Sequence, residues 1–216
     1  MKVHEVEFDS NYLVESCPCE QPASKDKKSP FFNISQRLER VAVRTRFFSA
    51  IYFFLFYKSM LQRELENSGL KPGAKVLHIG SGPSPYTALF LGRKGFKVDA
   101  IDCDNCAVRE ASLVVRQNGM EDSIKVVCGD GCTFKQKKYD AVWVSLNVYP
   151  KGKVLRQALG CLKDGGVLVY RNLPRWLSTL SKQTFKNSWP EGFQTSVTGR
   201  ILGTESVLVR KGQCCQ

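Results

Sequence analysis

An apolar strand, a glycine-rich turn and the start of a helix follow one another within residues 76–87, and this segment constrains the fold more than any other. It reads Val76-Leu77-His78-Ile79-Gly80-Ser81-Gly82-Pro83-Ser84-Pro85-Tyr86-Thr87. Glycines let a backbone turn sharply and approach a ligand without a Cβ in the way, and the first turn of a following helix presents unpaired N–H groups to that ligand. About twenty residues later, an apolar segment ends in Asp102, which can accept hydrogen bonds from both hydroxyls of a ribose. The two features together predict an α/β domain that binds a nucleoside.

Short apolar strands alternate with amphipathic segments after residue 70, which predicts a parallel sheet with helices on both faces. The predicted strands are residues 75–79, 97–101, 124–128, 140–145 and 166–170. Two more strand-like segments, 195–200 and 205–210, are separated by only four residues, so an antiparallel hairpin fits and a crossover helix does not. The predicted fold class is therefore α/β, a Rossmann-like doubly wound sheet that is mostly parallel and ends in an antiparallel hairpin.

The chain divides into three predicted segments. Residues 1–33 contain prolines and a polar cluster that break any periodicity, so we expect a flexible arm. Residues 34–70 carry apolar side chains at three- and four-residue spacings, which predicts a helical cover that ends at Gly69. Residues 71–216 form the predicted nucleoside-binding domain. No segment reaches the ~20 apolar residues of a membrane span, and the sequence starts without a signal segment, so we expect a cytoplasmic protein.

The charge distribution narrows the range of binding partners less sharply than these motifs do. The formal net charge is +12, and residues 151–216 hold eleven Lys or Arg against three acids. This excess favours an anionic substrate, an acidic partner or nucleic acid, and a basic soluble surface explains it equally well. Nucleic acid is the less favoured partner because no array of stacking aromatic residues accompanies the charge. We therefore expect a small-molecule substrate.

The chain contains nine cysteines, an odd number that without a signal segment predicts reduced thiols. Cys103, Cys106, Cys128 and Cys132 follow two strands that are neighbours in such a sheet, and four thiolates there would suit zinc. Free thiols are the simpler interpretation. The prediction is that the chain holds no metal.

The order of these motifs resembles that of the class I S-adenosylmethionine-dependent methyltransferases over residues 70–210. The resemblance implies S-adenosylmethionine as the cofactor, with the glycine loop under its methionine part, Asp102 at its ribose and Asp130 at its adenine amino group. Two positions depart from the pattern, since His78 replaces an acid and Ser84 replaces the third glycine. A dehydrogenase fingerprint would need a glycine at Pro85. The predicted cofactor-binding residues are Gly80, Ser81, Gly82, Ser84, Tyr86, Thr87, Asp102, Cys103, Gly129, Asp130, Gly131, Ser145 and Asn147.

The glycine loop also resembles the G-S-G-P-x-P-x-T turn of nicotianamine synthases, over residues 79–87. Those enzymes share the methyltransferase fold but transfer the aminocarboxypropyl group of the same cofactor to an amine. The segment from Tyr57 to Glu64 is similar to their N-terminal tyrosine and glutamate. Three alternatives follow. They are methyl transfer to a small molecule, either neutral or anionic, aminocarboxypropyl transfer, and a cofactor-binding module without catalysis.

Five side chains are the candidates for the substrate side of the site. Tyr57 and Glu64 lie in the predicted helical cover, and Asn147 and Tyr149 follow the fourth strand, where ligands meet the carboxyl edge of such sheets. Arg171 ends the fifth strand and could pair with a substrate carboxylate or phosphate. A sulfonium cofactor makes its neighbouring carbons electrophilic, so the protein mainly needs to position the acceptor. We predict no covalent nucleophile.

Overall fold

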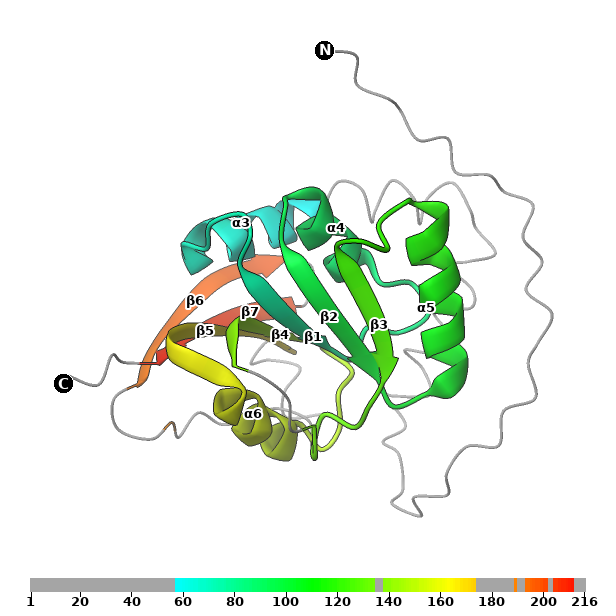
Figure 1. Ribbon diagram of the computed structural model, residues 1–216. Coiled ribbons are helices and arrows are strands. Elements are labelled where there is room, and N and C mark those ends of the chain that lie inside the picture. The colour runs from blue at the N-terminus through cyan, green and yellow to red at the C-terminus, as the bar shows by residue number, and fades with distance from the viewer. Residues whose placement is uncertain (1–56, 135–137, 174–188, 190–192, 202–203, 212–216) are drawn as a thin grey trace, which may run out of the picture.

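One seven-stranded sheet forms the centre of the structure, with its strands in the order β3-β2-β1-β4-β5-β7-β6 (Figure 1). The computed structural model describes residues 57–134, 138–173, 189, 193–201 and 204–211. The strands are β1 (Lys75–Ile79), β2 (Lys97–Asp102), β3 (Ile124–Cys128), β4 (Tyr139–Val144), β5 (Leu162–Asn172), β6 (Phe193–Ile201) and β7 (Thr204–Lys211). Strands β1 to β5 pair in parallel, and β7 runs antiparallel to β5 and β6. The predicted Rossmann-like sheet with its antiparallel C-terminal hairpin is therefore confirmed.

Helices cover both faces of this sheet. They are α3 (Lys58–Ser68), α4 (Tyr86–Arg93), α5 (Asn105–Gln117) and α6 (Lys151–Gly160). Leu91 of α4 and Val115 of α5 pack with Val76 of β1 in the core of one face. Leu155 of α6 packs with Leu77 in the core of the other face, and Figure 1 shows α6 on the side of the sheet opposite α3 and α4. Val76 and Leu77 point to opposite faces because successive strand residues alternate, and both are buried because both faces are covered.

The carboxyl ends of the parallel strands are joined by backbone hydrogen bonds that continue beyond the strands. The N–H of Gly80 donates to the carbonyl of Ile101 at 2.9 Å, and the N–H of Ser145 donates to the carbonyl of Ile79 at 3.0 Å. The residues that follow β1, β2 and β4 therefore lie in one row along this edge. None of the helices in the described ranges is long and apolar enough to cross a membrane.

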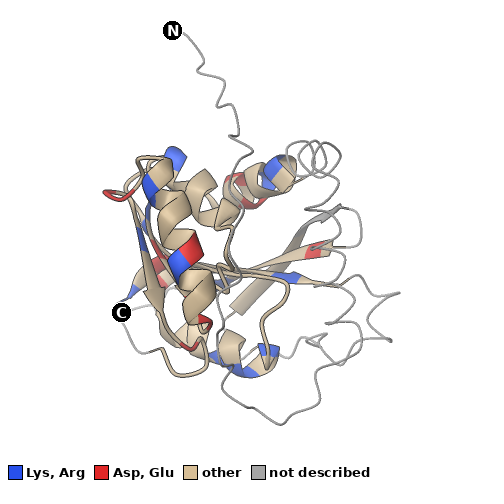
Figure 2. Cartoon of the chain, turned by 90° about the vertical axis from the view of Figure 1, so that its right-hand side faces the viewer, with Lys and Arg blue, Asp and Glu red and all other residues tan. Residues whose placement is uncertain are grey.

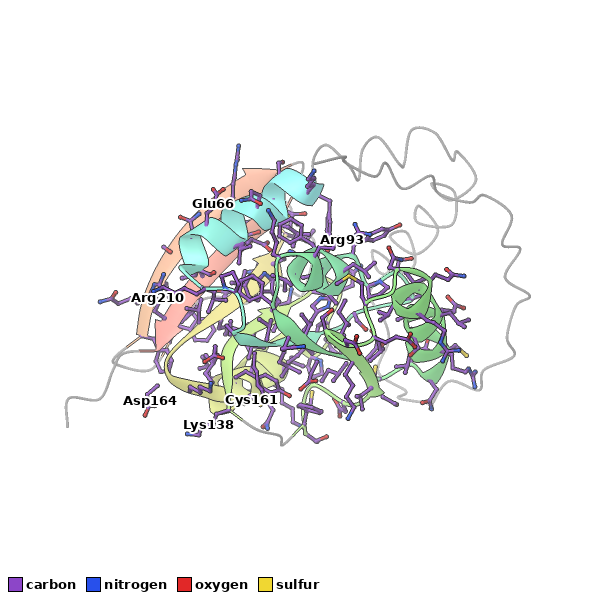
Figure 3. The ribbon with its side chains drawn as sticks, turned by 45° about the horizontal axis from the view of Figure 1, so that its top comes forward. Glu66, Arg93, Lys138, Cys161, Asp164 and Arg210 are labelled. Carbon is purple, nitrogen blue, oxygen red and sulfur yellow. The ribbon has the colours of Figure 1, made fainter. Side chains whose placement is uncertain are left out.

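Helix α3 is the described part of the predicted helical cover, residues 34–70. It ends at Gly69 as predicted, because this residue takes the left-handed conformation with φ of 68°. Arg210 of β7 donates to two carbonyls in the last turn of α3, at 2.8 and 3.1 Å, and so fixes this helix end to the hairpin (Figure 3). The predicted arm, residues 1–33, and residues 34–56 lie outside the described residues.

Candidate functional site

The glycine-rich loop between β1 and α4 is open at Gly82. This glycine has φ of +63°, and a Cβ added to it would meet no atom within 4 Å. Its N–H donates to Oδ2 of Asp102 at 2.8 Å. A left-handed conformation costs an L-residue roughly 1–2 kcal/mol, so the turn favours glycine. The open space beside the turn is where a ligand can approach the backbone.

Gly80 is instead packed against the loop that follows β4. It has φ of +78°, and a Cβ added to it would lie 2.5 Å from Cγ2 of Val148 and 3.4 Å from Cβ of Ser145. A real Cβ essentially never comes within 3.0 Å of another heavy atom, so only glycine permits this contact. The glycine loop and residues 145–150 are therefore adjacent walls of one site.

Two acids stand at the ends of the neighbouring strands β2 and β3. Asp102 is half-buried, and its Oδ1 accepts the N–H of Asp104 at 3.1 Å. Asp130 is exposed, and its Oδ1 accepts the N–H of Cys132 at 2.8 Å. The N–H of Gly129 donates to the carbonyl of Asp102 at 2.9 Å, which joins the two strand ends. Both carboxylates therefore lie at the carboxyl edge of the sheet, at the ends of adjacent strands.

The two glycines that flank Asp130 differ in how closely their surroundings pack against them. A Cβ on Gly131 would lie 2.6 Å from Cγ2 of Ile79, and one on Gly129 would lie 3.2 Å from an aromatic ring. The nearby Cys103 thiol is exposed, and partial burial together with the surrounding acids raises its pKa.

The cysteines at this edge do not form the zinc site that was one interpretation of their spacing. In the described part of the chain, no group of three or more His, Cys, Asp or Glu side chains is placed to hold a metal ion. Cys103, Cys128 and Cys132 are free thiols. Zinc needs its ligands to converge at about 2.3 Å, and these side chains do not converge.

Glu64 and Arg171 form an ion pair inside the protein. Nε and Nη2 of Arg171 donate to Oε1 and Oε2 of Glu64 at 2.9 and 2.8 Å, and the two residues are 4% and 0% exposed. Ser206 donates to Oε1 at 2.6 Å and the indole of Trp143 donates to Oε2 at 3.0 Å. Burial alone would raise the pKa of Glu64, but the charge of Arg171 and these hydrogen bonds outweigh burial and hold the pKa below its ordinary value. The carboxylate is therefore ionised and engaged at both oxygens.

The third guanidinium nitrogen of Arg171 connects this pair to the helix that follows the glycine loop. Nη1 donates to the hydroxyl of Tyr57 at 2.8 Å and to Oγ1 of Thr87, in the first turn of α4, at 3.3 Å. The Tyr57 and Thr87 hydroxyls lie 2.7 Å apart, and the guanidinium carbon lies 5.1 Å from the centre of the Tyr57 ring. Each nitrogen of Arg171 is thus engaged within the protein.

Aromatic and hydroxyl side chains surround the start of α4. Tyr86 is its first residue, and its ring meets that of Tyr57 edge to face at a centroid distance of 6.4 Å. Burial raises the pKa of Tyr86. Ser81 is buried, and its Oγ has no hydrogen-bond partner among the described residues, whereas Ser84 is exposed. A buried hydroxyl without a partner is expected to find one when a ligand or water occupies the site.

His78 is a buried histidine near the carboxyl end of β1. Its Nε2 lies 2.9 Å from Oγ of Ser145, at the carboxyl end of β4, and the residue is 2% exposed. Burial, and then the charge of Arg171, lower the pKa of His78 to about 3, so the imidazole is neutral near pH 7. Its Nδ1 has no partner among the described residues. His78 therefore acts here as a neutral support for Ser145.

The five predicted substrate-side residues fall into two groups. Tyr57, Glu64 and Arg171 meet in the buried network. Asn147 and Tyr149 are exposed on the loop after β4, Tyr149 at 62%. The structure thus separates these five residues into an internal polar cluster and an exposed loop.

Three residues of the site were not predicted from the sequence. Trp143 and Ser206 bond to Glu64 from β4 and β7, and no local pattern distinguishes them from other strand residues. Lys151 is buried at the first position of α6. A lysine at a helix N-terminus opposes the helix dipole, and this unfavourable placement is the sequence signal that could have identified Lys151.

The fold and the site together define a class of protein. A Rossmann-like sheet, an open glycine turn and a strand-end carboxylate that can hold a ribose are the features of an S-adenosylmethionine-dependent methyltransferase. A model of the protein-L-isoaspartate(D-aspartate) O-methyltransferase (PCMT) family matches residues 27–180, and the chain belongs to this family. The membership confirms the predicted class and its cofactor, S-adenosylmethionine. The residues fit the cofactor, since the space beside Gly82 is open and Asp102 is partly exposed.

Individual relatives are more distant. The chain is 23% identical to the ubiquinone/menaquinone biosynthesis C-methyltransferase UbiE of Idiomarina loihiensis over 159 residues, which cover 70% of this chain and 63% of that enzyme. It is 29% identical to UbiE of Vibrio cholerae over 113 residues, which cover 49% and 43% of the two chains. The match thus spans less than two thirds of the length of these curated relatives.

Solved structures show the same fold. A mutant of MtNAS, a nicotianamine synthase, in complex with S-adenosylmethionine superposes with a TM-score of 0.67 at 22% identity, covering 84% of this chain and 75% of that one. The [4+2]-cyclase SpnF gives a TM-score of 0.57 at 15% identity, covering 73% and 82%. Such low identities establish the shared architecture and leave the reaction to the site.

Proposed function

We propose that the chain transfers the methyl group of S-adenosylmethionine to a small molecule bound between the glycine loop and residues 145–150. The observation that carries the proposal is the open turn at Gly82, whose N–H bonds to the partly exposed Asp102 beside it. When bound, the cofactor supplies an electrophilic carbon next to its sulfonium. The acceptor needs to be held in line with that carbon, and the residues of this chain supply the positioning.

The resemblance to class I methyltransferases, together with the placement of the residues, supports the cofactor roles that we assign. We assign residues 80–87 to the methionine part, Asp102 to the ribose, and the turn from Gly129 to Gly131 to the adenine. Oγ of Ser145 lies beside the glycine loop and is supported by His78. Ser145 and Asn147 therefore lie where the cofactor and the acceptor would meet.

We assign the acceptor side to Asn147 and Tyr149, which are exposed at the carboxyl edge. Tyr57, Glu64 and Arg171 take a positioning role in this proposal because their polar atoms are engaged with one another. A small acceptor suits the site better than nucleic acid, because Figure 2 shows acidic residues among the basic ones on the elements that face the viewer.

Aminocarboxypropyl transfer is the second candidate reaction. Its support is the loop sequence Gly80-Ser81-Gly82-Pro83-Ser84-Pro85-Tyr86-Thr87 and the shared fold with MtNAS, which was also solved with MTA and tNA. The same cofactor and the same site would serve both reactions. The group transferred depends on which carbon next to the sulfonium faces the acceptor, and no residue pattern of the described chain decides this.

Product analysis tests these proposals directly. The purified chain is incubated with S-adenosylmethionine and a panel of small carboxylates, thiols and amines, and the nucleoside products are identified by mass spectrometry. S-adenosylhomocysteine would support methyl transfer, and methylthioadenosine would support aminocarboxypropyl transfer instead. Neither product, from a chain that binds S-adenosylhomocysteine in calorimetry, would favour a cofactor-binding module and overturn the proposal.

A further inference from the structure

Lys151 is a buried lysine that joins two strand ends at the carboxyl edge. It is 4% exposed. Its Nζ donates to the carbonyl oxygen of Leu146, in the loop after β4, at 2.8 Å, and also to the carbonyl oxygen of Arg171 near the end of β5. One side chain thus connects the loop that carries Asn147 and Tyr149 to the strand that carries the buried ion pair.

Neither charge pairing nor helix formation favours a lysine at this position. No carboxylate among the described residues forms an ion pair with Lys151. Burial, and then the charge of Arg171, lower the pKa of Lys151 to about 7, which means that the folded protein disfavours its charged form. Lys151 also begins α6, where the helix dipole favours anions. A lysine side chain is, however, long enough for its Nζ to donate to both carbonyl oxygens at once.

We propose that Lys151 is a positioning residue that holds residues 145–150 against the end of β5 and so sets the wall of the acceptor site. A neutral amine still has two N–H groups, and the two carbonyls need two donors, so the connection persists whether or not the lysine is charged. The role in the acceptor site rests on the proposed function, whereas the structural connection does not.

Hydrogen exchange followed by mass spectrometry tests the connection without an acceptor, on the full chain with S-adenosylhomocysteine as the probe ligand. The variant is Lys151→Met, which keeps the linear side chain and removes the donors. Exchange in the peptide that covers residues 145–150 is expected to rise about tenfold, the scale of one or two lost hydrogen bonds. Exchange in the peptides that cover β2 and β3, which lie beyond β1 in the sheet, is expected to stay within about twofold. Lys153→Met, an exposed lysine in the same helix, is the matched control and should change neither.

Two results would overturn the proposal. One is unchanged exchange in residues 145–150 of a folded Lys151→Met protein, and the other is a rise spread evenly over all peptides, which would indicate a general loss of stability. Lys151→Gln is the second variant, because its shorter side chain cannot span both carbonyls, and it should also loosen the loop. Once the product assay identifies an acceptor, the KM for it should rise in both variants. A chain without transfer activity would leave the exchange result intact, so the two failures are distinguishable.

Discussion

Arg171 near the end of β5 donates hydrogen bonds to both carboxylate oxygens of Glu64 in α3, 107 residues away in the sequence. The same guanidinium reaches Thr87 in the first turn of α4. The segment before the sheet, the fifth strand and the helix that follows the glycine loop are therefore fixed to one another by a single buried charge pair. A change in this pair is expected to disturb the fold first and the cofactor loop second.

Glu64→Gln should lower the free energy of unfolding by about 3–5 kcal/mol, because removal of one charge leaves Arg171 buried without its partner. Urea denaturation measures this. The matched control is Glu66→Gln, an exposed glutamate two residues further along α3, which should change stability by less than ~0.5 kcal/mol. Similar small effects in both variants would show that the buried pair does not stabilise the fold.

Asp102→Asn should weaken binding of S-adenosylhomocysteine about ten- to a hundredfold, because a charge-assisted hydrogen bond to the ribose is worth ~1.5–3 kcal/mol. The amide oxygen can still accept one of the two N–H groups that the carboxylate accepts, those of Gly82 and Asp104, so the melting temperature is measured beside the affinity. Isothermal titration calorimetry is the measurement, with the exposed Asp122→Asn as the control. Unchanged affinity in a folded Asp102→Asn protein would remove Asp102 from the cofactor site.

Two alanine substitutions in the glycine loop should differ in their effects. Gly80→Ala puts a Cβ 2.5 Å from Val148, so the melting temperature and the affinity for S-adenosylhomocysteine should both fall. Gly82→Ala meets no protein atom within 4 Å, so it should lose affinity and only the ~1–2 kcal/mol of the left-handed conformation. Calorimetry and thermal melting on both variants check this, and a larger loss of stability for Gly82→Ala would contradict it.

His78 should make stability depend on pH below neutrality. Its pKa is about 3 in the folded protein against an ordinary 6.5, so the unfolded chain binds the extra proton between these values and stability falls as the pH falls below 6.5. The contribution between pH 6.5 and pH 5 is ~2 kcal/mol, at about 1.4 kcal/mol per pH unit for one proton. Urea unfolding at pH 7 and pH 5 should show a smaller pH dependence for His78→Gln than for the natural protein. An equal dependence in the two proteins would mean that His78 titrates normally.

Tyr57→Phe should lower the free energy of unfolding by about 1–2 kcal/mol, because it removes a hydroxyl that accepts from Arg171 and leaves the ring in place. Tyr149→Phe is the control for stability, since Tyr149 is 62% exposed. In the transfer assay we expect Tyr149→Phe to have the larger effect. It should raise the KM for the acceptor, whereas Tyr57→Phe should leave that KM near the natural value. Loss of turnover in Tyr57→Phe with unchanged melting would instead give the Tyr57 hydroxyl a direct part in the reaction.

The elements of the sheet could be predicted because their signals are local. Predicted strands 75–79 and 124–128 coincide with β1 and β3, since an apolar run bounded by turn residues defines a buried strand. Strand β5, Leu162–Asn172, extends four residues before the predicted start, because Lys163, Asp164 and the two glycines that follow interrupt the apolar run although they continue the strand. A boundary of this kind depends on pairing with β4 and not on the side chains alone.

The sequence also predicted the glycine loop, but it did not distinguish the packing role of Gly80 from the open position of Gly82. Gly80 and Gly82 carry the same local signal, since both need a positive φ. The distinction arises because Val148, from a loop 68 residues later, packs where the Cβ of Gly80 would lie, whereas the space beside Gly82 is open. Only the assembled sheet decides which glycine faces a ligand.

By itself, then, the amino-acid sequence determined the order of strands and helices, the antiparallel ending, the glycine turn and the acid at its side. These features follow from hydrophobic periodicity and from backbone requirements that act within about twenty residues. The tertiary structure decided that Glu64 engages Arg171, that His78 supports Ser145 and that Lys151 connects two strand ends. Each of these side chains would be solvated in an isolated segment. Their pairing depends on burial. Without water, a buried charge or hydrogen-bond donor is stable only when the fold places a protein partner beside it.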